Sequence, residues 1–272
     1  MTTARQIFAV QALELRKRFL GKRSIPVYLL AMIPLIIFMA RFVALRVFHL
    51  HEGDSIAQSQ VMYAVLFRTL ILRFVVFFGS VFVFVPLFRG DILDRSLHYY
   101  FLVPIKRQTL TLAKYLSGLL AALVLFNGVT IATWTIWYLT EGRTALVERL
   151  LSGHGPLELG GYLLVTSLAC VGYGAVFLAA GVFFKNPIVP AVAILGWESI
   201  NVFLPPVLKK VSVIHYLESL CPVSIPQTSG IAILADPASP WVAIPGILIL
   251  AAILVVVAAQ RVRRLEILYG VE

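Results

Sequence analysis

Long runs without a charged side chain are the feature that most constrains this chain. Between consecutive charges lie uncharged stretches at 24–40, 74–88, 115–140, 159–184 and 237–260, and 186–208 is interrupted only by Glu198. A membrane core about 30 Å thick requires about 20 apolar residues per helix, so the three longest stretches are each sufficient. The two shortest reach spanning length if Arg41 and Arg73 lie at a membrane face, with their long stems extended toward the headgroups.

The composition excludes a water-soluble globular domain, because 60% of residues are hydrophobic and only 13% are charged. We predict an all-α integral membrane fold with one transmembrane domain over 1–272. Its expected parts are an interfacial helix at 4–23, a cytoplasmic segment at 89–114 and an outer re-entrant region at 211–240. The re-entrant region is apolar but broken by Pro222, Pro226 and Gly230. Six spans are expected, at 25–45, 62–88, 115–139, 160–184, 187–207 and 241–260.

The excess of basic residues predicts orientation. The net charge is +10, and an N-terminus inside with six spans puts 15 of the 23 Lys and Arg on the inner side. In a soluble protein this charge would favour nucleic acid, but here it predicts a multi-pass protein of a cell membrane, such as a bacterial inner membrane. Both termini are expected in the cytoplasm, in contact with lipid and without a nucleic-acid partner.

The sequence lacks motifs that would make the chain an enzyme. It contains no G-x-x-x-x-G-K-[ST], no H-E-x-x-H and no G-x-S-x-G. The five histidines fall in loops or interfaces, so no metal or haem site is expected. The two cysteines predict no disulfide framework.

The segment between the second and third predicted spans resembles known transporters. Asp94-Arg95-Ser96-Leu97, Val103-Pro104-Ile105-Lys106-Arg107 and then Lys114 resemble the corresponding segment in permeases of type-2 ABC exporters. In that family the segment is a coupling helix, the permease acts as a pair, and the layout has six spans with an interfacial helix and a re-entrant stretch.

This resemblance implies a permease subunit, driven by a separate ABC ATPase that binds ATP and Mg, and paired with a second copy or a sister permease. The chain itself would hold no cofactor. Charged residues of the segment can pair across a contact and its apolar residues can be buried there; an ordinary basic loop remains the alternative. The residues expected to contact the ATPase are Asp91, Asp94, Arg95, Ser96, Leu97, Tyr99, Pro104, Arg107 and Lys114.

Several polar residues lie within predicted spans. Glu198, with Asn127, Thr130 and Asn201, is a candidate for lining a pathway, although Glu198 could be a structural carboxyl, and Asn127 and Thr130 could equally join helices. Arg68 and Arg73 are expected as outer-face cations, either presented to an anionic substrate or lipid, or extended to the headgroups.

Two other functional classes stay open. An ion-coupled secondary transporter would need ionisable residues at mid-membrane, for which Glu198 is the one candidate. A membrane scaffold or enzyme subunit would explain the missing motifs but not the coupling-like segment. The sequence favours a hydrophobic or amphipathic cargo without identifying it.

Overall fold

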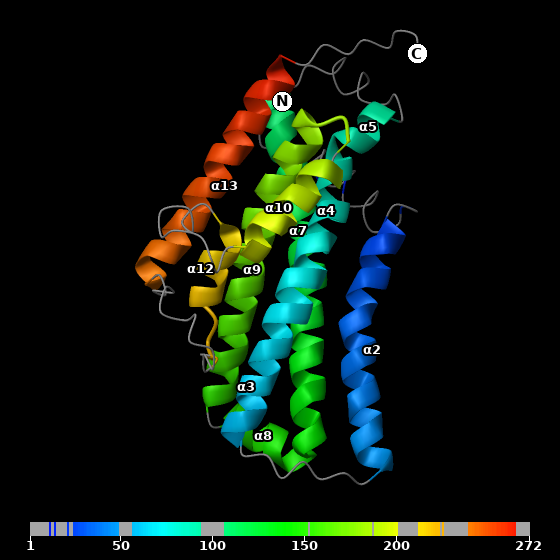
Figure 1. The fold of residues 1–272 in the computed structure, drawn as a ribbon, viewed down its shortest axis with the longest axis vertical. Coiled ribbons are helices and arrows are strands. Elements are labelled where there is room, and N and C mark those ends of the chain that lie inside the picture. The colour runs from blue at the N-terminus through cyan, green and yellow to red at the C-terminus, as the bar shows by residue number, and fades with distance from the viewer. Residues whose placement is uncertain are drawn as a thin grey trace.

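The computed structural model describes residues 11, 14, 21, 24–48, 56–93, 106–151, 153–186, 188–200, 212–223, 225 and 239–264. All regular structure in this part of the chain is helical (Figure 1). Five helical stretches are long and apolar enough to cross a membrane, which is what an integral membrane protein requires: α2 (Ile25–Val47), the continuous stretch Gln58–Leu87, α7 (Arg107–Glu141), α9 (His154–Phe183) and α13 (Pro240–Arg263).

These five helical stretches coincide with five of the six predicted spans. Two of them, α7 and α13, extend beyond the predicted range at both ends, and α7 already begins at Arg107 within the expected cytoplasmic segment. In place of the predicted span at 187–207 there is the shorter helix α10 (Ile188–Ile200) of 13 residues, and residues 201–211 lie outside the described part. Five spans are thus confirmed as long apolar helices, whereas the sixth stays a prediction.

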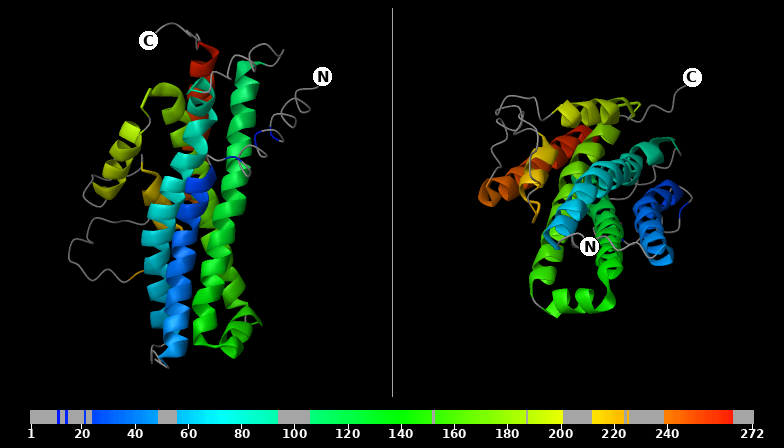
Figure 2. Two further views of the ribbon diagram at one scale, coloured as in Figure 1. Left: turned by 90° about the vertical axis from the view of Figure 1, so that its right-hand side faces the viewer. Right: turned by 60° about the horizontal axis from the view of Figure 1, so that its bottom comes forward.

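The helix ends follow local chemistry. Gly142 has φ of 129° directly after α7, and Gly153 has φ of 77° directly before α9, backbone conformations that a side chain disfavours. Between them, α8 (Arg143–Leu151) lies across the end of the bundle, joining α7 to α9 (Figure 2). Helix α13 begins with Pro240 after an extended Ser239, where the missing N–H of proline costs no helical hydrogen bond.

The second span is assembled from four helical pieces. α3 (Ile56–Leu66) continues into a π-helix, η2 (Phe67–Val76), then into α4 (Phe77–Phe84) and the 3₁₀ turn η3 (Val85–Leu87). The short helix α5 (Arg89–Leu93) follows. Residues 94–105, the middle of the predicted coupling segment 89–114, lie outside the described part.

Helix α9 is the centre of the bundle and packs against α13, α7 and α4. Small residues allow these close approaches. A Cβ on Gly181 would lie 2.8 Å from the main-chain oxygen of Val85, so α9 and the second span meet backbone to backbone at that point. Large aromatic side chains fill the core nearer α8: Tyr63, Phe67, Trp134, Trp137, Tyr138 and Tyr162.

Hydrogen bonds establish which segments share an end of the bundle. Arg107 donates to the main-chain oxygen of Arg263 at 3.1 Å, so α7 begins where α13 ends. At the opposite end, Arg41 of α2 donates to Thr140 of α7 at 3.0 Å. The described parts of 89–114 and 261–264 therefore share one end (Figure 1).

Candidate functional site

A π-helical stretch in the second span carries two arginines. Arg68 and Arg73 both lie in η2, and Arg73 stands midway along the stretch Gln58–Leu87. In an α-helix, residues five apart point about 140° away from each other. In a π-helix the backbone hydrogen bond joins residues five apart, so their side chains lie on nearly the same face. The exposure pattern agrees, since Thr69 and Phe74, also five apart, are both exposed.

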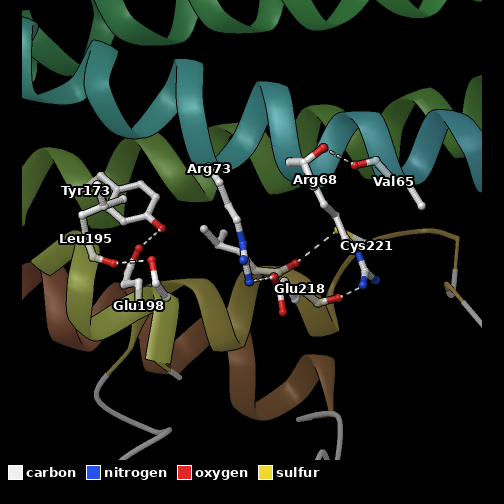
Figure 3. A network of polar contacts seen from close by, with 11 residues as sticks. Val65, Arg68, Arg73, Tyr173, Leu195, Glu198, Glu218 and Cys221 are labelled. Atoms are coloured by element: carbon white, nitrogen blue, oxygen red, sulfur yellow. Dashed lines mark hydrogen bonds and ion pairs between the residues drawn. The ribbon is translucent and has the colours of Figure 1, made fainter. Parts of the chain in front are cut away.

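Both arginines bind the same residue of the short helix α12 (Val213–Ser219). Arg73 Nη2 lies 2.6 Å from Glu218 Oε1, and Arg68 Nη2 donates to the main-chain oxygen of Glu218 at 3.2 Å (Figure 3). We call Arg68, Arg73 and Glu218 the arginine cluster. The sequence placed both arginines near the outer face; the structure places their guanidinium groups against α12, within the predicted re-entrant region. Isolated arginines within a span are costly, and this pairing offsets the cost.

The carboxylate of Glu198 lies beside the arginine cluster. Glu198 is 7% exposed and accepts a hydrogen bond from the Tyr173 hydroxyl at 2.6 Å (Figure 3). A cavity of about 20 Å³, room for about one water, separates it from the cluster. The cavity is lined by Arg73, Phe77, Leu195, Glu198, Ser199 and Ile214.

Cys221 follows α12 and lies close to the arginine cluster. Its Sγ is within 3.5 Å of the main-chain oxygen of Leu217. Burial raises the pKa of the Cys221 thiol, and the neighbouring Arg68 guanidinium opposes that shift. The raised pKa makes this cysteine a poor nucleophile at neutral pH.

A second cluster of charges is fully buried at the α5 end of the bundle. Lys114 Nζ donates to Glu14 Oε1 at 2.7 Å and to the main-chain oxygen of Leu87 at 2.9 Å, and it also pairs with Asp91. We call Lys114, Glu14 and Asp91 the lysine cluster. The exposure of all three is 2% or less. One ammonium group therefore joins the N-terminal segment, the base of α5 and the third span in a low-dielectric environment.

The residues expected to contact an ATPase are divided by the structure. Asp91 and Lys114 pair with each other inside the chain, whereas Arg107 is partly exposed and bound to the end of α13. The other six, Asp94, Arg95, Ser96, Leu97, Tyr99 and Pro104, lie outside the described residues. The structure thus describes both ends of the segment, at 89–93 and 106–114, and the ATPase contact expected at 94–105 stays a prediction.

Two of the pathway candidates join helices α7 and α9. Asn127 donates to Ser167 at 3.0 Å, and Thr130 lies 3.2 Å from the Thr166 hydroxyl. These contacts fit the interpretation of interhelical hydrogen bonds. Asn201 lies outside the described residues.

Sequence reasoning did not single out Glu14, Tyr173 or Glu218. A signal for Glu218 was present, since two arginines within an apolar helix require a counter-charge and Glu218 precedes a long uncharged stretch. Glu14 and Tyr173 carried no such signal. The described residues contain no group of three or more His, Cys, Asp and Glu side chains that could hold a metal ion.

Comparison with known proteins gives no relative from which a function could be transferred. No family model matches the chain, and neither the curated proteins nor the solved structures yield a match. Any functional assignment therefore rests on the residues and their geometry.

Proposed function

We propose that this chain is the membrane-spanning permease subunit of an ATP-binding-cassette exporter. Two copies, or one copy with a sister permease, would enclose the pathway, and a separate ATPase would dock on 89–114 and supply the energy of ATP hydrolysis. The five long apolar helices and the resemblance of 89–114 to the coupling segment of type-2 exporters support this function. On this proposal the end that carries α5 and the start of α7 faces the cytoplasm.

The lysine cluster is the observation that carries the proposal. A motor that pushes on a loop does work only if the loop is rigidly attached to the helices that must move. Lys114 fixes the base of α5, through Asp91, to the first two turns of α7, and fixes the N-terminal segment, through Glu14, to the same point. Buried charges hydrogen-bonded in this way are costly to separate, so a displacement of α5 would be passed to α7.

Co-purification with the ATPase tests the proposal. The tagged chain is extracted from its native membrane with a mild detergent, and an ATPase with a Walker motif should be retained in near-equal amount. Leu97→Glu or Asp94→Lys should abolish retention, because either change disrupts the apolar or the charged part of the contact. The matched control is Glu148→Lys on the exposed face of α8, at the opposite end of the bundle, which should retain the ATPase.

Crosslinking locates the contact directly. In a chain with Ser96→Cys, a short bifunctional thiol reagent should join residue 96 to the ATPase, whereas Thr144→Cys in α8 should give no such product. Recovery of the chain without any ATPase from the native membrane, together with transport unaffected by Leu97→Glu, would refute docking at this segment.

The ion pairs within the bundle favour a second candidate, an ion-coupled secondary transporter. Glu198 and the Arg73–Glu218 pair are ionisable groups far from either end of the bundle. Reconstituted vesicles separate the two candidates. Uptake driven by an imposed proton or sodium gradient without ATPase would favour the secondary transporter, and dependence on the ATPase and ATP would favour the exporter.

A further inference from the structure

We propose that Arg68 and Arg73 form a binding site for the phosphate headgroup of an amphiphile, and that Glu218 is the internal anion that occupies the site when no ligand is bound. The binding site stands without the proposed transport function. In the permease proposed above, the same site would receive an acidic group of the cargo, and only that statement rests on the proposed function.

The first support is the helix geometry. Only a π-helical stretch directs residues 68 and 73 to one face, and the π-helical form is rare and concentrated at functional sites. An ordinary α-helix over the same residues would separate the two guanidinium groups by about 140° around the axis. The irregular backbone therefore produces a pair of cations that the regular backbone would not.

The second support is the charge balance. Among the described residues, Arg73 pairs with the Glu218 carboxylate, and Arg68 donates to the main-chain oxygen of the same residue. Glu198, across the small cavity from Arg73, accepts a hydrogen bond from Tyr173, and no ion pair of Glu198 occurs among the described residues. Two guanidinium groups thus bind one glutamate directly, which leaves N–H donors for an anion with several oxygens.

The third support is accessibility. The side chains of Arg73 and Glu218 are 39% and 28% exposed, so a ligand can approach the pair without unpacking the core. Arginine forks match the geometry of phosphate oxygens and bind two of them at once. The site lies midway along an apolar span, where a headgroup arrives attached to an apolar tail. These features together identify the ligand class.

Binding is measured on the purified full chain in a nonionic detergent, by native mass spectrometry and by calorimetry with short-chain lipids. We expect dihexanoyl phosphatidic acid to bind at least tenfold more tightly than dihexanoyl phosphatidylcholine. Inorganic phosphate distinguishes a free phosphate ligand from a lipid. If millimolar inorganic phosphate displaces the phosphatidic acid, the phosphate group alone is sufficient for binding. If it does not, binding also requires the apolar tail. Equal binding of the two lipids to the wild-type chain would overturn the proposal.

The variants test which residues hold the ligand. Arg68→Gln and Arg73→Gln should each weaken phosphatidic acid binding about fivefold or more, and together they should remove the preference. Arg46→Gln is the matched control, because Arg46 is an exposed cation in the last turn of α2 that, among the described residues, contacts α7 and not α12, and it should bind as the wild type does.

Glu218→Gln separates a ligand site from a purely structural ion pair. If Glu218 occupies the site in place of a ligand, removing its charge should strengthen phosphatidic acid binding about five- to tenfold. A structural role predicts the opposite, because α12 would detach and the site would be lost. Weaker binding by a monodisperse Glu218→Gln chain, or an unchanged preference in the double arginine variant, would overturn the proposal. The assay contains no ATPase, so its failure would leave the co-purification test unaffected.

Discussion

Replacing the lysine of the lysine cluster is the most demanding test of the fold. Lys114→Met keeps the length and the apolar stem of the side chain but removes the ammonium group that serves Glu14, Asp91 and the carbonyl of Leu87. Removing one partner of a buried ion pair costs about 3–5 kcal/mol, because the other charge stays buried without compensation. Lys114 pairs with two buried carboxylates, so we expect the upper part of that range.

The two cysteines make the measurement simple. Cys170 is buried and Cys221 is half-buried, so a thiol-reactive dye becomes fluorescent as the detergent-solubilised chain unfolds. One kcal/mol corresponds to about 2–4 °C in a protein of this size, which converts the expected loss into a decrease in Tm of about 10 °C or more. The double variant Lys114→Met/Asp91→Asn should recover about 1–2 kcal/mol, because an amide is less costly to bury than an uncompensated carboxylate.

Lys106→Met is the control for this experiment. Lys106 is exposed, directly precedes α7 and lies at the same end of the bundle, so its replacement removes the same charge from a solvated position. Its Tm should stay within about 2 °C of the wild type, as expected for an exposed charge. If Lys114→Met melted equally close to the wild type, the assignment of Lys114 to a buried pair would be refuted.

Two further experiments use positions at which the structure predicts the direction of the effect. Gly181→Ala should lower Tm at a cost of about 1–3 kcal/mol, because the new Cβ would lie 2.8 Å from the Val85 carbonyl oxygen. Gly160→Ala, with open space around it, should instead gain up to about 1 kcal/mol of helix stability. Equal shifts of Tm in the dye assay would contradict the backbone contact at Gly181. For Cys221, whose pKa is raised by burial, alkylation by iodoacetamide followed by mass spectrometry should accelerate with pH beyond the usual thiol pKa of about 8.5, and the fully buried Cys170 should stay unlabelled until unfolding. A plateau of the Cys221 rate below pH 9 would contradict the raised pKa.

The sequence was sufficient to locate the long helices, and the reason is physical. A charged side chain in lipid costs so much that the distance between charges reports the length of a span. The ends were less well predicted. Helix α7 continues over Arg107–Lys114 because Lys114 is not solvated there but neutralised by Asp91 and Glu14. Charge spacing alone cannot distinguish a charge in water from a charge paired within the protein.

The arginine cluster shows a second limit of prediction from the sequence. The pattern of apolar residues predicted a helix through Arg68 and Arg73, but not that it changes to the π form there. In the folded chain both arginines contact α12, and Glu218 lies 145 residues beyond Arg73. Contacts between residues so far apart in the sequence form only in the folded chain, so the local hydrophobic periodicity cannot predict them.

Both clusters link short helices to the long ones. In lipid, helices gain little from burying apolar surface, so polar contacts add to the close packing that holds such segments in place. α5 is attached to α7 through Lys114, and α12 is attached to the second span through Arg73. An attachment made by charges can be exchanged for the charges of a ligand, but only where a ligand can reach them. Lys114 is fully buried and the Arg73 side chain is 39% exposed. The lysine cluster is therefore suited to transmit displacement, and the arginine cluster to exchange Glu218 for an incoming anion.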